Sequence, residues 1–304
     1  MNDAKELPTV DEAKTAALRS EDRAGSPVKL QACCSSCAAP DDAFGAAAAS
    51  AYVYAIGRIE ARFPTLAVEK EFAQATARTD TAGKTDQQTY HAVLSQREYR
   101  YLVRQLCWVL TIQGLDTYLL APRDPADFDL LVEAIRPTPR ADDLDVVIGV
   151  RGPTAAPTMC NGLLLPIVAF EQIYSFDRAL LVQAIPRPDE STPEQFGPAA
   201  EELFSRIMQL TDNAGNSDEH RALNYLAMRY PAIYARAAAA FAQDFSLTGV
   251  DVRRSQLSST RSIVDVIFAY TNRNTDFTEK FSVRCDMTGM FPFLVNKLST
   301  YYDR

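Results

Sequence analysis

An alternating run near the C-terminus constrains the fold of this chain most strongly. Apolar residues recur through Ser262–Tyr270 with the period of a half-buried strand. The polar stretch Thr271–Thr275 supplies a turn, and Phe277–Cys285 has the composition of a returning strand. These three segments predict an antiparallel β-hairpin.

Other segments predict a mixture of strands and helices. Strands are expected at residues 52–59, 115–120 and 144–150, and an apolar run covers residues 163–170. Helices are expected at residues 66–76, 128–135, 198–210 and 218–245, the last with a break at Pro231, and a short final helix from Phe291. Residues 85–111 have helical periodicity, but their last part, 102–112, also fits a buried strand.

This order of elements favours an α+β fold, with helices packed against a mixed or antiparallel sheet. Regular βαβ alternation is missing, and so are the glycine-rich nucleotide-binding motifs, so a doubly wound α/β sheet ranks second. Residues 1–50 are expected to form a flexible N-terminal lead-in that contains a Cys-x-x-Cys motif and an alanine-rich linker. Residues 51–304 are expected to form the folded domain.

Charge and hydropathy exclude several classes of partner. The chain has a net charge of −8 and a pI of about 5.0, whereas a nucleic-acid-binding protein usually carries a basic stripe. No apolar stretch reaches the roughly 20 residues that span a bilayer, and the N-terminus lacks the apolar core of a secretory signal. The sequence therefore predicts a cytoplasmic protein without a nucleic-acid or membrane partner, whose six cysteines are thiols or metal ligands.

The Cys34–Cys37 pair is the most informative group for chemistry. Two thiolates at Cys-x-x-Cys spacing can bind one Zn²⁺, because the turn between them directs both sulfurs to a common point. Tetrahedral zinc needs two further ligands, which must come from isolated positions. Cys160 is the better candidate, followed by Cys107 and then Cys285. The resulting prediction is a structural Zn²⁺ held by Cys34, Cys37, Cys160 and Cys107.

Two other interpretations of these cysteines stay open. A redox motif normally follows a strand and begins a helix, whereas a polar segment precedes this pair and an alanine-rich segment follows it. The pair can also be inert within an unstructured lead-in. Cys107 stands beside Trp108 in an apolar run, so it also fits a buried core position.

No catalytic constellation is recognisable. The two histidines, His91 and His220, both fall on predicted helices, and a half-buried helical position is the simpler interpretation for each. Two acidic groups lack the ligand order of a calcium-binding loop, so helix capping is expected for the first and a solvated loop for the second: Asp124, Asp127 and Asp129; Asp142, Asp143 and Asp145.

Residues from about 51 to the C-terminus resemble the C-terminal domain of unknown function of the cyanobactin maturation proteases, the PatA and PatG type. The likeness rests on residues 51–60, 104–112, 122–129, 145–153, 159–162, 218–225, 265–268 and 301–304. In that family the domain is appended to enzymes that cut and macrocyclise ribosomally made, modified peptides. The subtilisin-like protease domain with its Asp-His-Ser triad is missing from this sequence, so the resemblance implies a free-standing relative that does not inherit the proteolysis.

The resemblance implies a non-catalytic interaction domain that binds a precursor peptide or a peptide-maturation enzyme. Exposed aromatic residues are the expected contacts, with Tyr52, Tyr54, Tyr301 and Tyr302 as candidates and core packing as the simpler role for Tyr54. The alternative is a zinc- or thiol-dependent peptide-modifying enzyme that uses Cys34, Cys37 and His220. The sequence is also compatible with a homodimer.

Overall fold

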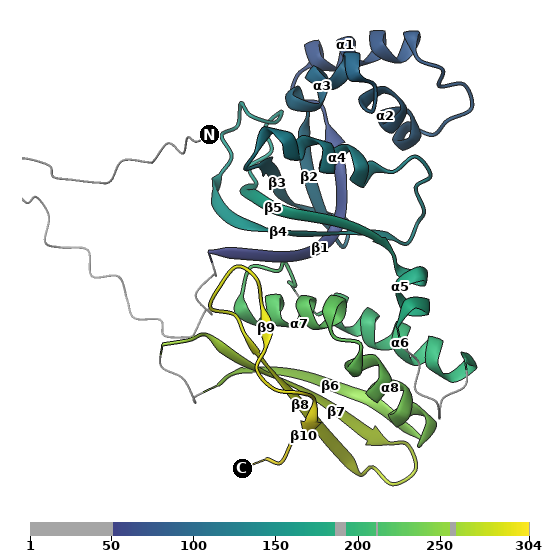
Figure 1. Cartoon of the computed structure of the whole chain (residues 1–304), viewed down its shortest axis with the longest axis vertical. Coiled ribbons are helices and arrows are strands. Elements are labelled where there is room, and N and C mark those ends of the chain that lie inside the picture. The colour runs from purple at the N-terminus through teal and green to yellow at the C-terminus, as the bar shows by residue number, and fades with distance from the viewer. Residues whose placement is uncertain (1–50, 186–192, 211, 256–259, 304) are drawn as a thin grey trace, which may run out of the picture. The chain divides into compact units, whose positions relative to one another are not determined.

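The computed structural model describes residues 51–185, 193–210, 212–255 and 260–303 (Figure 1). The cysteine pair Cys34–Cys37 and the rest of the predicted lead-in lie outside these ranges. The described part contains two sheets together with helices, which confirms the mixed α+β class. One sheet closes into a barrel and the other is an antiparallel sheet in the C-terminal part.

The first sheet is a closed five-stranded barrel with the order β1-β2-β3-β5-β4. Strands β3 and β5 are parallel, and the other neighbours are antiparallel. Closure removes the free edges of an open sheet. The strands are β1 (Tyr52–Arg62), β2 (Cys107–Ile112), β3 (Leu115–Pro122), β4 (Asp143–Thr154) and β5 (Pro166–Asp177).

Strand β1 changes its partner at Gly57. Residues Tyr52–Gly57 pair with β4, and residues Arg58–Arg62 pair with β2 on the opposite edge. A Cβ atom at Gly57 would lie 2.3 Å from the backbone oxygen of Thr111. Only glycine allows the two backbones to approach this closely where the strand crosses between its partners.

Helices enclose the apolar interior of the barrel. Between β1 and β2 lie α1 (Leu66–Arg78), α2 (Asp86–Leu94), the 3₁₀ turn η1 (Arg97–Tyr99) and α3 (Arg100–Gln105), and between β3 and β4 lie η2 (Pro125–Asp127) and α4 (Phe128–Ile135). The buried Trp108 belongs to this core, and its indole N–H donates to the carbonyl of Val103 at 2.9 Å. A capping box at Thr85 and Gln88 fixes the start of α2.

The C-terminal part packs helices on an antiparallel sheet with the order β10-β8-β7-β6, and β9 pairs with β8. The elements are α5 (Arg178–Ala184), α6 (Pro193–Met208), α7 (Asp218–Arg229), α8 (Ala232–Ala242), β6 (Phe245–Arg254), β7 (Ile263–Asn272), β8 (Thr278–Asp286), β9 (Phe293–Leu294) and β10 (Ser299–Thr300). The β7–β8 hairpin confirms the sequence prediction. Helix α7 contacts both β1 of the barrel and β7 of this sheet (Figure 1).

Three element predictions were wrong. The stretch 85–111 is not one helix, because α2 and α3 are separate; for its last part the alternative of a buried strand is correct, since residues 107–112 form β2. The final segment from Phe291 is not helical, because β9 and β10 pair with β8. The helix predicted to reach Phe245 ends at Ala242, where the chain enters β6.

Candidate functional site

The structure pairs two of the four predicted zinc ligands with each other. Cys107 at the start of β2 and Cys160 in the turn before β5 form a disulfide, with their Cα atoms 5.9 Å apart. This corrects the expectation that the cysteines are thiols or metal ligands, because a disulfide sulfur has no thiolate to offer a metal. No local pattern reveals this pairing, because the two cysteines have a sequence separation of 53.

The remaining cysteines divide between the core and the undescribed segment. Cys285 is fully buried in β8, and burial raises the pKa of its thiol to about 12. Cys34 and Cys37 lie outside the described residues, so a zinc site at this pair stays a prediction. Within the described ranges, no group of three or more His, Cys, Asp or Glu side chains is placed to hold a metal ion.

The first acidic group stabilises the start of a helix, as predicted. Asp124 accepts a hydrogen bond from the backbone N–H of Ala126 at 2.8 Å, which caps η2 directly before α4. Asp129 in the first turn of α4 forms an ion pair with Arg100. Asp124 and Asp129 therefore have structural roles at the start of this helical segment.

The second acidic group is not a solvated loop, which corrects that prediction for Asp145. Its carboxyl is buried in β4, where it accepts from the backbone N–H of Ile59 at 2.8 Å and from the hydroxyl of Ser175. Asp143 is paired with Arg136 at 2.5 Å. Burial raises the pKa of Asp145 to about 6, even though both hydrogen bonds favour the charged form.

The raised pKa of Asp145 predicts a pH-dependent stability. Because the folded state binds this proton more tightly than the unfolded chain, its contribution is fully present below the ordinary pKa and is lost as the pH rises to about 6. Relative to an Asp145→Asn variant, the free energy of unfolding of the native protein should fall by on the order of 2 kcal/mol between pH 4 and pH 6.5. Urea unfolding of both proteins across this range measures the difference. Parallel stability curves would contradict the prediction.

The two histidines occupy half-buried helical positions, as predicted. Burial lowers the pKa of both imidazoles. The Nδ1 atom of His220 is buried without a hydrogen-bond partner among the described residues, and its backbone N–H donates to the hydroxyl of Ser217 at 3.1 Å. No bond joins His220 to the carboxylates of Asp218 or Glu219 within the described part of the chain, so the orienting contact of a catalytic histidine is missing there.

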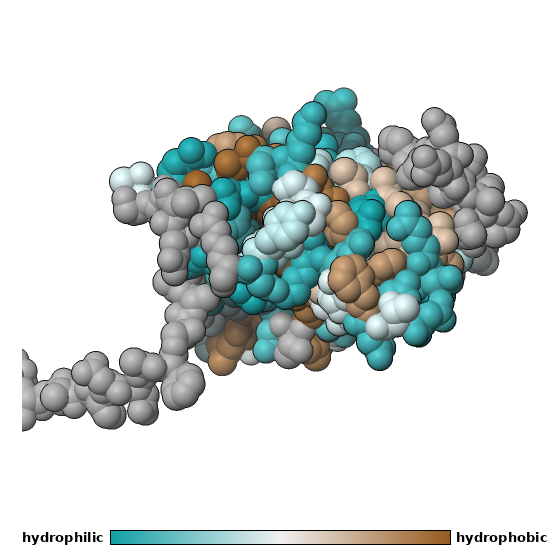
Figure 2. Space-filling model, turned by 90° about the horizontal axis from the view of Figure 1, so that it is seen from below, coloured by the Kyte–Doolittle hydropathy of each residue, from teal (hydrophilic) through white to brown (hydrophobic). Residues whose placement is uncertain are grey.

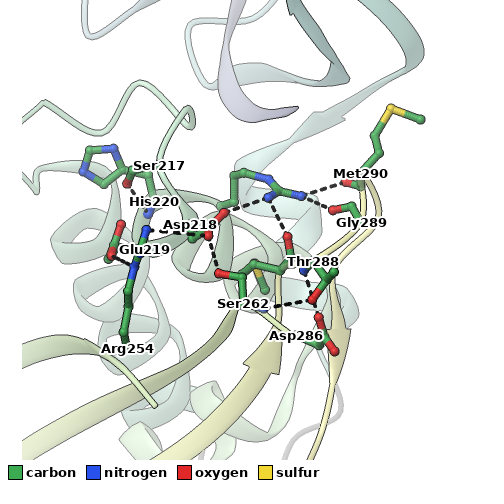
Figure 3. Close-up of polar contacts among 12 residues, drawn as sticks. Ser217, Asp218, Glu219, His220, Arg254, Ser262, Asp286, Thr288, Gly289 and Met290 are labelled. Carbon is green, nitrogen blue, oxygen red and sulfur yellow. Dashed lines mark hydrogen bonds and ion pairs between the residues drawn. The ribbon is translucent and has the colours of Figure 1, made fainter. Parts of the chain in front are cut away.

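The most connected polar group surrounds Arg221 near the start of α7 (Figure 3). The guanidinium is fully buried, and it donates to Asp218 and to the carbonyl of Met287, each at 2.9 Å. It also donates to the carbonyls of Gly289 and Met290. One side chain therefore holds the loop that follows β8 against α7.

Asp218 extends this network toward the loop between β6 and β7. Its second carboxylate oxygen accepts from the hydroxyl of Ser262, and the half-exposed Arg254 lies 4.0 Å away. The backbone N–H of Ser262 donates to the hydroxyl of Thr288 at 2.9 Å (Figure 3). The start of α7 thus connects two loops that are distant in sequence.

One helical turn further on, α7 is bonded to the barrel. Asn224 donates to the carbonyl of Tyr54 in β1 at 2.8 Å, and its side chain forms two hydrogen bonds with that of Asn213. The backbone N–H of Tyr54 donates to the carbonyl of Gly215 at 2.9 Å. Buried amides that are satisfied in this way fix one arrangement of the packed elements.

Helix α7 is therefore a structural junction. Residues Asp218, Arg221 and Asn224 stand at three-residue intervals, and their polar atoms bond to loops, to β1 and to each other. The segment 218–225 was singled out in the sequence, but the structural role of Arg221 was not foreseen. Its carbonyl partners belong to residues 287–290, and nothing in the local pattern reveals them.

A scan of the described helices found none that is long and apolar enough to cross a membrane. Residues 190–301, which include α6 to β10, match the family model described as PatG C-terminal. A solved structure described as "PatG Domain of Unknown Function" superposes with a TM-score of 0.67 and 19% identity. The aligned region covers 83% of this chain and 99% of that chain, so the two share a fold. No curated protein sequence matches the chain.

Proposed function

We propose, from the premise that this chain carries a PatG C-terminal domain, that it is an accessory interaction domain in the maturation of ribosomally made, modified peptides. Domains of this type are associated with cyanobactin maturation. In this role the domain binds a precursor peptide or a partner enzyme and presents one to the other. The chemistry of cleavage or modification then belongs to the partner.

The distribution of exposed apolar side chains carries this proposal. Four of the ten large hydrophobic residues that are exposed in the described ranges belong to the last part of the PatG-matched segment, and a fifth directly follows it: Phe277, Phe291, Phe293 and Val295, then Tyr302. Aromatic side chains supply much of the binding energy in protein interfaces. Tyr302, one of the predicted contact residues, is 79% exposed, whereas Tyr54 is buried in the core.

The mixed polarity of the surface also favours a partner that binds reversibly. The face shown in Figure 2 carries hydrophobic residues between hydrophilic ones. A surface that mixes the two is typical of complexes that form and dissociate, whereas permanent interfaces are more apolar. The hydrogen bonds of the buried Arg221 hold the loop between β8 and β9 against α7.

A binding titration tests the proposal. A fluorescein-labelled linear cyanobactin-type precursor peptide, and separately each enzyme of the same maturation pathway, is titrated with the protein. We expect saturable binding of at least one of them, and a Phe291→Ser/Phe293→Ser variant should weaken binding of a partner enzyme at least tenfold. The matched control is Leu66→Ser at the start of α1, where an exposed hydrophobic residue lies outside the PatG-matched segment. Failure of both peptide and enzymes to bind would overturn the proposal.

The alternative is a zinc- or thiol-dependent peptide-modifying enzyme that uses Cys34 and Cys37. It requires bound metal or a reactive thiolate at that pair, because Cys107 and Cys160 are joined to each other. Elemental analysis of the purified protein discriminates the two proposals. The enzyme would be the correct proposal if the native protein contains stoichiometric zinc, a Cys34→Ser variant loses it, and the native protein turns over a precursor peptide.

A further inference from the structure

Strand β1 pairs with β4 along its first half, Tyr52–Gly57, and with β2 along its second half, Arg58–Arg62. Each half therefore has one side without a strand partner. We call the side of Tyr52–Gly57 that faces away from β4 the first half-edge, and the side of Arg58–Arg62 that faces away from β2 the second half-edge. In an antiparallel strand, the N–H and C=O of one residue point to the same side, and successive residues alternate between the two sides. Tyr54 points away from β4, since its N–H donates to Gly215. The even-numbered residues of β1 therefore face the β2 side, and the odd-numbered residues face the β4 side.

The first half-edge is filled. Strand β2 pairs with β1 only from Arg58 onward, and the segment before it, at Tyr54, is covered by the α6–α7 loop and α7. Gly215 accepts from the Tyr54 N–H, and Asn224 donates to the Tyr54 carbonyl. Both backbone groups that the sheet leaves unpaired at Tyr54 thus obtain a partner.

The second half-edge begins where the pairing of β1 with β4 stops, near the start of β4. The ladder to β4 stops at the pair Gly57–Asp145, and the carboxylate of Asp145 takes the next N–H on that side, from Ile59. The alternation then directs the carbonyl of Ile59 and both the N–H and the C=O of Ala61 to the β4 side. No described residue bonds to these three groups.

A cleft of about 210 Å³ lies along this half-edge. Its walls are the C-terminal half of β1, the start of α2 and the end of α4, and it is lined among others by Ile59, Ala61, Tyr90 and Ile135. Arg58 lines the same cleft and forms no ion pair with a described residue. The lining also carries the acidic residues Glu60, Asp86, Asp143 and Asp145 and two further arginines, Arg62 and Arg140, so the cleft combines unpaired strand backbone with a mixed apolar and charged wall.

We propose that an extended segment of a peptide substrate adds to β1 as a strand in this cleft, with Ala61 as the residue that exchanges two hydrogen bonds with it. Strand addition of this kind takes its affinity from main-chain bonds and its selectivity from neighbouring pockets. The antiparallel orientation continues the direction of β4 and brings the C-terminal side of the peptide toward the Gly57–Asp145 pair, next to Arg58. The proposal rests on the proposed function, because it names the site at which the precursor peptide binds.

The hydrogen-bond pattern is what selects a peptide as the occupant. A donor and an acceptor on Ala61, with a second acceptor two residues earlier, match the repeat of an extended backbone. Pairing of β1 with a second copy of this chain would use the same groups, so the oligomeric state belongs to the test. A closed barrel leaves few such edges, which makes the unpaired backbone at Ile59–Ala61 distinctive.

The variant Ala61→Pro tests the edge without removing a bond of the sheet. Since Ala61 and Trp108 form a non-hydrogen-bonded pair, the proline removes only the N–H that faces the cleft, and proline is tolerated on strand edges of this kind. Ala61→Ser, which keeps the N–H, is the matched control. Fluorescence anisotropy with the labelled precursor peptide should show at least a tenfold loss of affinity for Ala61→Pro and less than a twofold change for Ala61→Ser. Circular dichroism checks that both variants keep the fold.

A series of peptides, each N-methylated at one backbone nitrogen, gives a second measurement that needs no variant. Strand addition predicts that methylation weakens binding at every second position and leaves the positions between unaffected. Equal affinity of the native protein and Ala61→Pro for the peptide would overturn this inference while the proposed function stands. Absence of peptide binding to the native protein would overturn this inference, and the proposed function would fall with it only if the maturation enzymes also fail to bind. A native dimer that Ala61→Pro dissociates in sedimentation velocity would assign the edge to a second copy and overturn the peptide as its occupant.

Discussion

Replacing Arg221 by methionine should lower the melting temperature of the protein by about 10 °C, because loss of one partner of a buried ion pair costs about 3–5 kcal/mol. The guanidinium is fully buried and reaches Asp218 and three loop carbonyls. Methionine fills much of the volume but donates no hydrogen bond. Asp218 would keep its charge with only Ser262 as a close partner, and the loop after β8 would lose its attachment to α7.

The matched control is Arg254→Met, which removes an arginine from the same carboxylate. Arg254 lies 4.0 Å from Asp218, and its side chain is 54% exposed, so the expected loss is below about 1 kcal/mol. Differential scanning calorimetry of both variants measures the contrast. If Arg221→Met melts within 2 °C of the native protein, the buried network does not hold α7 to the loops. Near-ultraviolet circular dichroism should also change for Arg221→Met, because Tyr52 lies against the guanidinium at 5.3 Å.

Local sequence signals predicted those elements whose partners are close in the chain. The β7–β8 hairpin follows from the alternation at Ser262–Tyr270 and from a turn in which the side chain of Asn272 accepts from Asn274 and Thr275. The break at Pro231 separates α7 from α8 for an equally local reason, since proline cannot continue the hydrogen bonding of the preceding helix. Both predictions depend on neighbouring residues alone.

Tertiary contacts decided the elements that the sequence did not predict. The barrel closes through the parallel pairing of β3 with β5, which joins residues 119–122 to residues 167–170. The segment 107–112 carries helical periodicity from its predecessor, but burial of all six residues between β1 and β3 makes it a strand. The final segment becomes β9 and β10 because the outer edge of β8 is available to it.

The same distinction applies to the candidate site. The pair Cys34–Cys37 is a sequence signal because its spacing is local, whereas the pairing of Cys107 with Cys160 exists only in the folded chain. The open edge of β1 has no sequence signature at all, since Ala61 is an unremarkable residue in an apolar strand. It becomes a candidate only because the pairing of β1 with β4 stops at Asp145, the third residue of β4, and no described strand takes over the pairing.

Replacing Gly215 by alanine should destabilise the protein by about 2–5 kcal/mol, because two separate penalties combine at this residue. Gly215 has φ +69, a conformation that is unfavourable for alanine, and an added Cβ would lie 2.3 Å from the carbonyl oxygen of Tyr54. The loop would have to move away from β1. The buried N–H of Tyr54 would then lose the carbonyl of Gly215 as its acceptor.

Gly83→Ala separates these two penalties. Gly83 has a nearly equal φ of +74, but no atom lies within 4 Å of its added Cβ, so only the conformational cost of about 1–2 kcal/mol applies. Urea unfolding of the two variants should therefore show a larger loss for Gly215→Ala, and the difference measures how tightly the loop before α7 is held against β1. Equal losses would mean that the loop yields freely. In that case the loop before α7 would not firmly cover the side of β1 at Tyr54. The two sides of β1, covered at Tyr54 and uncovered at Ala61, would then no longer differ in accessibility.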